Sequence, residues 1–339
     1  SGLLRIWTST DGITWTAADL DRPTGGGLRA VTGRGTDLVA VGYSLVATSS
    51  DGVTWTGTSP GGVWMHDVTV GGPGFVAVGG SENDGWSAAW TSQDGITWSK
   101  QPFGPTSGSW LMTEMTAITT GGPGFVAVGH GPLPGNVGVW PGGVAWVWTS
   151  PDGFTWTRAP HIPDLSIAAG LRDVATYGDT LVAVGSGTEG AAAVFTSNDG
   201  ITWQQLPHDD LFNPWAMTSV VQYGDKLVAA GGDSVWIGTP QPSEPVPDTP
   251  TTTAAIEPTT ETIAQTRSTV APTPETTMPS AISALRFRVD ELDGEWWPGS
   301  DVAALPGGGF VVVTDGNGVF WTEDGEVWAD ADPDRMVSA

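Results

Sequence analysis

Histidine, arginine, tryptophan and acidic residues occur in this sequence at places where together they could bind a ligand. Two pairs, His66-Asp67 and Arg172-Asp173, put a carboxylate directly after a basic side chain. Aromatic rings stack on the apolar faces of sugars, and carboxylates accept hydrogen bonds from hydroxyl groups. Two carboxylates about 5 to 9.5 Å apart could also hydrolyse a glycosidic bond. The candidate ligand-binding residues are Arg29, Trp64, His66, Asp67, His130, Arg172, Asp173 and Trp215.

These residues also have a structural interpretation. An acidic residue beside a histidine or arginine at a strand end often forms an ion pair between repeats, and such surface pairs contribute little to stability. His66 and His130 with acidic neighbours could hold a metal, but no metal-binding spacing supports this, so we predict neither a metal nor a cofactor. The chain has no cysteine, which excludes thiolate metal sites and disulfides.

The segments that must position the candidate residues repeat along the chain. Each repeat contains an apolar run that ends in glycine, such as FVAVGG at 75–80, followed by an S-x-D-G-x-T-W pattern. The intervals between the first five aspartates of this pattern are 40, 43, 58 and 47 residues, which is typical of propellers, solenoids and arrays. The pattern occurs around Asp11, Asp51, Asp94, Asp152 and Asp199, and more weakly around Asp324.

One repeat predicts four short strands. In residues 171–206 these are LRDVAT, TLVAVG, AAVFTS and ITWQQL, which are rich in β-branched and apolar residues and are separated by turn residues. We find no long segment with helical spacing. Four strands per repeat of this length are typical of a propeller blade. We therefore predict an all-β fold, a β-propeller of five to seven four-stranded antiparallel blades.

The S-x-D-G-x-T-W pattern predicts a tight turn between the third and fourth strands. The aspartate can accept hydrogen bonds from backbone N–H groups one and two residues further on, and the glycine adopts a positive φ. The tryptophan is expected to fold back beneath the turn. The residues predicted to be structural in this way are Asp11, Asp51, Asp94, Asp152, Asp199 and Asp324 with Trp15, Trp55, Trp98, Trp156, Trp203 and Trp328.

This pattern resembles the Asp-box, or BNR repeat, of propellers of the sialidase superfamily. The resemblance covers about residues 1–240 and 301–328, and the adjacent Asp and Gly are similar to those of uncharacterised bacterial BNR-like repeat proteins. It implies boxes at the propeller periphery, away from any active site, so it indicates the fold and not the activity. The arginine signature of sialidases, followed by Ile-Pro, is absent, since the nearest match is LLRIW with Arg5.

The blade topology predicts two different ends. The S-x-D-G-x-T-W turns share one end with the turns between first and second strands, and the remaining loops share the other end, where ligand sites usually lie. All four histidines and the candidate residues fall at that loop end. Tyr43, directly after VAVG, could face it too. As surface residues, Trp64, His66 and Asp67 are expected to contribute little to stability. Further aromatic and acidic residues of this end are Trp86, Trp110, Trp140, Glu82, Asp84, Glu114, Asp164, Asp209 and Asp210.

Composition divides the chain into three parts. Residues 241–283 are rich in Thr, Pro and Glu, which predicts a disordered linker between the propeller at 1–240 and a further blade at 284–339. That blade either closes the ring or begins a second propeller. Linkers of this kind are common in exported proteins, so we expect a secreted or cell-surface protein, present here as a mature form or a fragment.

Charge and hydropathy restrict the partners. With 37 acidic against 12 basic residues, a formal charge of −25, the chain should repel nucleic acid and anionic membranes. No apolar run reaches the roughly 18 residues of a membrane span. We predict a non-catalytic extracytoplasmic propeller whose loop end binds a glycan or a protein. The alternatives are a sialidase-like glycoside hydrolase acting through carboxylates and, more distantly, an assembly factor.

Overall fold

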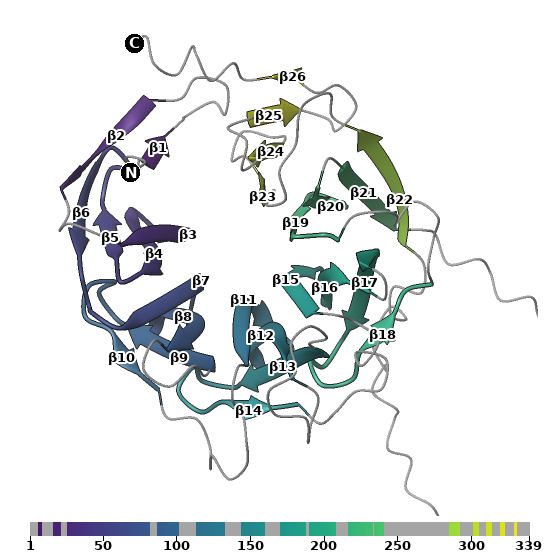
Figure 1. Ribbon diagram of the computed structural model, residues 1–339, viewed down its shortest axis with the longest axis horizontal. Helices are drawn as coiled ribbons and strands as arrows, with labels where there is room; N and C mark the ends of the chain where they lie inside the picture. The colour runs from purple at the N-terminus through teal and green to yellow at the C-terminus, as the bar shows by residue number, and fades with distance from the viewer. Residues whose placement is uncertain are drawn as a thin grey trace, which may run out of the picture.

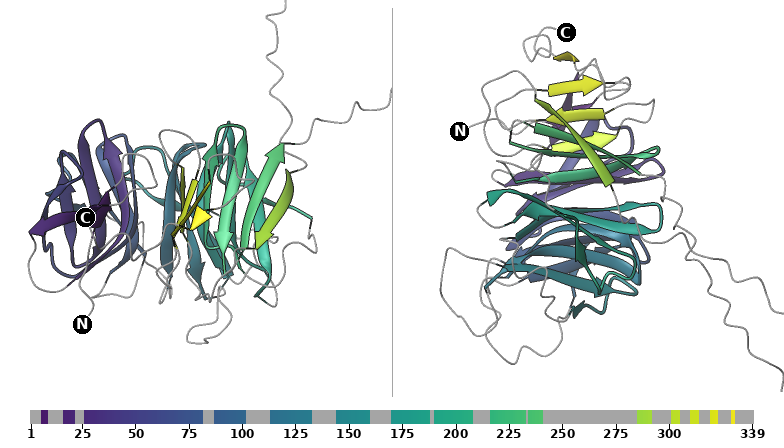
Figure 2. Two further views of the ribbon diagram at one scale, coloured as in Figure 1. Left: turned by 90° about the horizontal axis from the view of Figure 1, so that it is seen from above. Right: turned by 90° about the vertical axis from the view of Figure 1, so that its right-hand side faces the viewer.

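All regular elements that the structure describes are β-strands. The computed structural model describes residues 6–8, 16–21, 26–81, 87–101, 113–132, 144–159, 170–187, 190–207, 216–232, 234–240, 285–291, 301–304, 310–313, 319–322 and 329–330. The strands form several antiparallel sheets that follow one another around a common centre (Figure 1). Seen from the side, the sheets stand next to one another and their strands run across the thickness of the molecule (Figure 2). The prediction of an all-β fold of antiparallel sheets is confirmed.

Four of the sheets have four strands each, in chain order from the centre outward. The first strand of each sheet, here called the inner strand, lies nearest the centre (Figure 1). The strands are β11 (Glu114–Gly121), β12 (Gly124–Gly131), β13 (Val144–Ser150) and β14 (Thr157–Arg158); β15 (Gly170–Tyr177), β16 (Thr180–Ser186), β17 (Ala192–Ser197) and β18 (Gln204–Gln205); β19 (Ser219–Tyr223), β20 (Lys226–Gly231), β21 (Ser234–Pro240) and β22 (Leu285–Glu291); β23 (Asp301–Ala304), β24 (Phe310–Val313), β25 (Val319–Thr322) and β26 (Ala329–Asp330).

The N-terminal strands form one larger sheet of ten strands, with two four-stranded parts of the same kind. A single pair, Tyr43 opposite Trp64, links the two parts. The short strands β1 and β2 extend the sheet at its outer edge, where β2 runs parallel to β6. The strands are β1 (Ile6–Thr8), β2 (Thr16–Asp21), β3 (Gly27–Arg34), β4 (Asp37–Tyr43), β5 (Val46–Ser49), β6 (Thr54–Thr58), β7 (Val63–Gly71), β8 (Gly74–Ser81), β9 (Ser87–Ser92) and β10 (Ser99–Lys100).

One boundary differs from the sequence prediction. Residues 284–339 were expected to form a separate blade, but β22, at 285–291, pairs with β21 and becomes the fourth strand of the preceding sheet. The next sheet begins only at β23. Apolar residues precede and follow the Thr/Pro-rich segment, and an apolar pattern alone does not say which of two sheets a strand joins.

The core lies between neighbouring sheets and not in one central cluster. Between the sheets that begin with β11 and β15, for example, Val126 and Val147 pack with Leu171, Phe195 and Trp203. All five are at most 2% exposed. Similar clusters join the other neighbouring sheets between residues 39 and 237. The sheets that lie between two others in residues 63–206 therefore bury both faces against their neighbours, which explains why their middle strands are apolar without alternation.

In the ten-stranded sheet, β3 and β7 lie nearest the centre and are also called inner strands (Figure 1). Four inner strands, β3, β7, β11 and β15, carry a bulge near their first residues. The register shifts after Leu28, Met65, Met115 and Leu171, so that one residue in each strand, here called the bulge residue, has no partner opposite it. The facing strand has a glycine at this level, for example Gly129, whose added Cβ would overlap the carbonyl oxygen of Glu114. The bulge residues are Arg29, His66, Thr116 and Arg172.

Within the described residues, no helix has the length and apolar character needed to cross a membrane.

Candidate functional site

The S-x-D-G-x-T-W segments fold into the same turn four times, twice in the ten-stranded sheet and once in each of the next two sheets. Around Asp51, Oδ1 accepts hydrogen bonds from the backbone N–H groups of Val53 and Thr54, both at 2.8 Å, and from the Ser49 hydroxyl at 3.0 Å. The N–H of Gly52 donates to Ser49 Oγ at 2.8 Å. The aspartate thus reaches the second and third residues after it, one position further than expected, because it caps the turn as an N-cap residue caps a helix.

This geometry recurs around the next three aspartates of the pattern. Backbone hydrogen bonds to the ionised carboxylate lower the pKa of Asp94 to about 2, and they also lower the pKa of Asp51 and Asp152. Each tryptophan folds back under its turn and donates Nε1–H to the glycine carbonyl, as in Trp203 to Gly200 at 3.1 Å. Asp11, Trp15, Asp324 and Trp328 lie outside the described residues.

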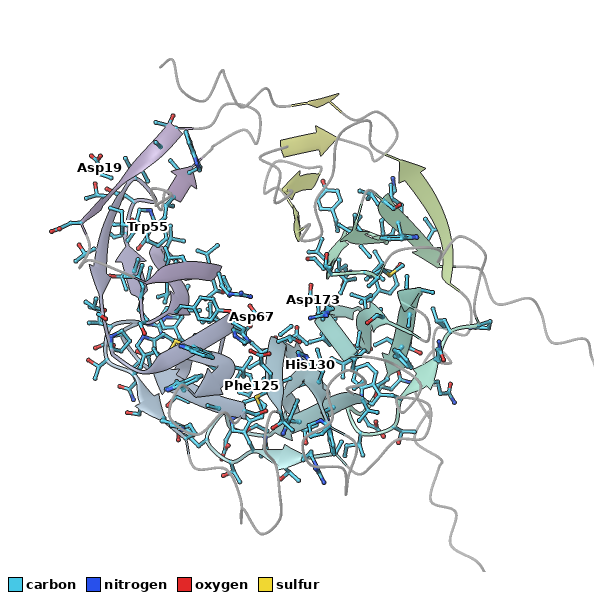
Figure 3. The ribbon with its side chains drawn as sticks, in the orientation of Figure 1. Asp19, Trp55, Asp67, Phe125, His130 and Asp173 are labelled. Atoms are coloured by element: carbon cyan, nitrogen blue, oxygen red, sulfur yellow. The ribbon has the colours of Figure 1, made fainter. Side chains whose placement is uncertain are left out.

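Carboxylates on two inner strands hold neighbouring sheets together. Asp67 Oδ1 accepts the N–H of Val68 at 2.7 Å, and its Oδ2 accepts the N–H of Ile118, on the next inner strand, at 2.8 Å. Asp173 repeats this with the N–H groups of Val174 and Val220, both at 2.7 Å. Figure 3 shows both aspartates at the inner strands, close to the centre. Each carboxylate therefore fixes its own bulge and connects two sheets.

Two of the bulge residues make a second bond between sheets. His66 Nδ1 lies 3.0 Å from the carbonyl oxygen of Met115, and the Thr116 hydroxyl donates to the carbonyl of Leu171 at 3.0 Å. A carbonyl oxygen can only accept, so Nδ1 of His66 carries the proton. The equivalent positions thus satisfy equivalent backbone carbonyls with different side chains. His66 is 9% exposed, and the expectation that it is a surface residue was wrong.

The second nitrogen of His66 faces Glu114 on the neighbouring inner strand. Nε2 lies 3.1 Å from Glu114 Oε1, and His130 Nε2 lies 3.5 Å from Oε2 of the same carboxylate. The His66 contact is short but lacks the angles of a hydrogen bond. Burial lowers the pKa of His66 and of His130, although the charge of Glu114 opposes this in both. The positive charge of Arg29 lowers the pKa of His66 further, and that of Arg172 lowers the pKa of His130 further.

Aromatic and arginine side chains extend this group on the strands that precede it. The Trp64 ring meets the Tyr43 ring edge-on at 5.8 Å, and the His66 ring lies 5.8 Å from Tyr43 in the same geometry. The Arg29 guanidinium stacks on Tyr43, 4.5 Å from the ring centre. Trp64 remains 39% exposed, and Arg29 is exposed as well. We call the following residues the inner cluster: Arg29, Tyr43, Trp64, His66, Glu114, His130 and Arg172.

The structure brings most of the predicted site residues together. Arg29, Trp64, His66, His130 and Arg172 belong to the inner cluster, while Asp67 and Asp173 lie beside it in backbone hydrogen bonds. Trp215, like His161 and His208, lies outside the described residues. The sequence did not single out Glu114 as the partner of both histidines, or Tyr43 as the ring between Arg29 and Trp64. Glu114 lies two residues before the bulge residue of its strand, which is the position of Trp64 in β7. This equivalence with Trp64 was the signal by which the sequence could have indicated Glu114.

No group of three or more His, Asp or Glu side chains within the described ranges has a geometry that could hold a metal ion. The two imidazoles of the inner cluster lie against opposite oxygens of one carboxylate, and one Nδ1 is already bonded to a backbone carbonyl. The described part of the cluster can therefore exchange protons and donate or accept hydrogen bonds.

Comparisons with known proteins indicate the fold. No protein-family model matches the chain, and no curated protein sequence matches it. Among solved structures, one described as YCF48 bound to D1 peptide is similar with a TM-score of 0.52 and 13% identity, over 93% of this chain and 84% of that chain. An ancestral GH74 enzyme is similar with a TM-score of 0.55 and 13% identity, over 95% of this chain. This chain spans 42% of that enzyme. At such identities the likeness shows the fold alone, and the chain has the sheet arrangement of β-propeller structures.

Proposed function

We propose that this chain is a non-catalytic binding propeller that holds a glycan or a protein segment on its inner cluster. The observation that carries the proposal is the combination of exposed Trp64, on β7, with two exposed arginines, Arg29 and Arg172, at the bulges of two other inner strands. Trp and Arg are the side chains that most often dominate binding surfaces. A rigid core of sheets holds them in place, so little ordering is needed when a ligand binds.

The hydrolase alternative requires two free carboxylates. Among the described acids of the inner strands, Asp67 and Asp173 already accept two or more hydrogen bonds each from the protein. Glu114 remains, and it contacts two histidines. Hydrolysis through a carboxylate pair therefore has no specific support in the described part of the site. The likeness to a GH74 enzyme does not change this, because a fold hosts many activities.

The finer description of the fold belongs to the proposal too. The recurring turn, with its aspartate, glycine and tryptophan bonds, supports assignment of this chain to the Asp-box propellers, with five to seven blades. We also propose that it acts outside the cytoplasm, on the basis of the Thr/Pro-rich residues 241–283. A peptide-bound structure of similar fold makes a protein ligand a reasonable first candidate.

The experiment is a direct comparison of binding and hydrolysis. The full chain is screened on a glycan array and a peptide library, and in parallel on chromogenic glycosides that include sialosides. The expected result is binding without turnover. The dissociation constant of Trp64→Ala should be at least about tenfold larger than that of the parent chain, which corresponds to the loss of one contact worth about 1.4 kcal/mol.

The matched control is Phe154→Ala. Phe154 is a large apolar residue, 45% exposed, in one of the recurring turns at the opposite end of the sheets. Its removal should leave binding unchanged. Loss of binding in Phe154→Ala but not in Trp64→Ala would place the ligand on the turn end and refute the proposal, and turnover of a glycoside would establish the enzyme alternative.

A further inference from the structure

His66 in its neutral form leaves two acceptors facing each other. Because Nδ1 carries the proton that bonds the Met115 carbonyl, neutral Nε2 presents a lone pair, and 3.1 Å away lies a carboxylate oxygen of Glu114, which also accepts only. Nε2 is fully buried, so bulk water does not fill the role of donor. A single added proton turns this repulsive pair into an attractive ion pair, with the imidazolium 3.1 Å from the carboxylate oxygen.

His130 takes part through the same carboxylate. Its Nε2 lies 3.5 Å from Oε2, and its side chain is 15% exposed, against 6% for His66. A proton on either imidazole changes the field at the other, since both lie against one carboxylate. The charged groups that act on them are Glu114 from β11, Arg29 from β3 on His66, and Arg172 from β15 on His130. Asp67 from β7 and Asp173 from β15 follow the bulges in sequence, and their carboxylates bond backbone N–H groups. Tyr43 from β4 completes the surroundings of His66.

The two protons change the charge of this group strongly. With both imidazoles neutral, two arginines stand against the single carboxylate of Glu114. With both imidazoles protonated, four cations stand against the same carboxylate. The carboxylates of Asp67 and Asp173 are tied to backbone N–H groups and cannot turn toward the rings to compensate. The positive charge of the inner cluster therefore depends on the two protons.

We propose that His66, Glu114 and His130 form a proton-binding unit that sets the charge of the inner cluster, so that acidification favours anionic groups on its ligand. The unit is distinct from the recurring turns, whose carboxylates bond only backbone and hydroxyl donors. The proposal has two parts. The effect of the charge on ligands, called the ligand half, rests on the proposed function, because it assumes that ligands bind at Trp64, Arg29 and Arg172. The binding of protons, called the proton half, concerns the free protein alone.

The proton half is tested by NMR titration of the histidine ring protons in the full chain. The pKa values of His66 and His130 should lie below the ordinary value of 6.5, because both rings are buried. Glu114→Gln should lower both values further, because it removes the negative charge that favours the protonated rings. Asp37→Asn is the control, since it removes an exposed carboxylate paired with Arg34 at 3.8 Å and should shift neither ring. If the titration midpoints of His66 and His130 are the same in Glu114→Gln as in the parent chain, the proposal is overturned.

The ligand half uses two defined probes, tetraglutamate and tetralysine peptides. Perturbation of the Trp64 indole signal should show tighter tetraglutamate binding at a pH below the measured titration midpoints of His66 and His130 than at about pH 7.5, by roughly threefold for each charge added. Tetralysine should show the opposite trend. The double variant with His66→Asn, whose amide keeps a donor toward the Met115 carbonyl, and His130→Gln should bind both peptides without this pH dependence.

The outcomes separate the two proposals. Equal affinity at both pH values in the unmodified chain overturns the charge effect even if the titrations behave as expected. Absence of any perturbation at Trp64, at either pH, overturns the ligand surface of the proposed function, while the titrations still decide the proton half.

Discussion

The turn end and the inner end of the sheets use repetition in opposite ways. At the turn end, four turns place the same residues in the same hydrogen bonds, down to the tryptophan Nε1 and the glycine carbonyl. At the inner end, the equivalent bulge positions hold Arg29, His66, Thr116 and Arg172. The backbone is equally regular at both ends. Side chains are therefore constant where every sheet has the same need and different where the sheets do different work.

The comparison also shows that variation is not by itself a sign of function. His66 and Thr116 differ in type, yet both donate to the same carbonyl position of the next sheet. Asp67 and Asp173 look like site residues in the sequence, yet both bond the backbone of the neighbouring sheet. What separates the proposed ligand surface from the scaffold is exposure, and Arg29, Trp64 and Arg172 are the exposed members.

The largest loss of stability is expected from a substitution at the turn end, where the side chains are constant. Trp203 is 2% exposed and packs in the core between two sheets. Trp203→Ala should lower the free energy of unfolding by about 3 to 5 kcal/mol, the usual cost of truncating a buried aromatic residue. Urea denaturation followed by circular dichroism measures this. A loss below about 1 kcal/mol would mean that the turn tryptophans do not support the sheets.

A smaller effect is expected where the inner end is structural. Asp67→Ala should lower the free energy of unfolding by about 1 to 3 kcal/mol, because the N–H of Ile118 is left without its acceptor between two sheets. Asp37→Ala, at an exposed position, should change it by less than about 0.5 kcal/mol. Equal effects of the two substitutions, measured by thermal and urea denaturation, would contradict the role of Asp67 in joining sheets.

The stability of the fold at acid pH should distinguish the turn aspartates from carboxylates that have an ordinary pKa. Because the pKa of Asp94 is lowered from 3.8 to about 2, its bonds stabilise the fold above 3.8, and this stabilisation is lost as the pH falls through about 2. The difference in free energy of unfolding between the parent chain and Asp94→Asn should therefore shrink from about pH 5 to about pH 2. A constant difference across this range would show that the carboxylate charge does not matter to the turn.

The smallest effect on stability belongs to the exposed part of the inner end. Trp64→Ala should change the free energy of unfolding by less than about 0.5 kcal/mol, since the ring is 39% exposed and meets Tyr43 by its edge. Binding should nevertheless fall, as proposed above. A melting temperature that drops as far as in Asp67→Ala would assign Trp64 to the scaffold and remove the main support for a ligand surface.

Sequence reasoning predicted the turns better than the site, for a physical reason. A turn is local, so the types and spacing of Ser49, Asp51, Gly52 and Trp55 were enough to predict a tight turn, apart from which N–H groups the aspartate bonds. The inner cluster joins residues from several repeats. That Glu114 meets both His66 and His130 depends on the bulge, which turns one residue per inner strand out of register, and no alternation in the sequence shows where that occurs.

The strand pairing at β21 and β22 has a consequence for synthesis. These neighbours in one sheet are separated by residues 241–284, so β21 leaves the ribosome well before the strand that completes its sheet. At roughly 5 to 20 residues per second, the delay is on the order of 2 to 9 seconds. During that interval the backbone groups along one side of β21 lack their strand partner, and such an edge can pair with other chains. The nascent protein therefore passes through a period in which β19, β20 and β21 form a sheet that still lacks its outer strand.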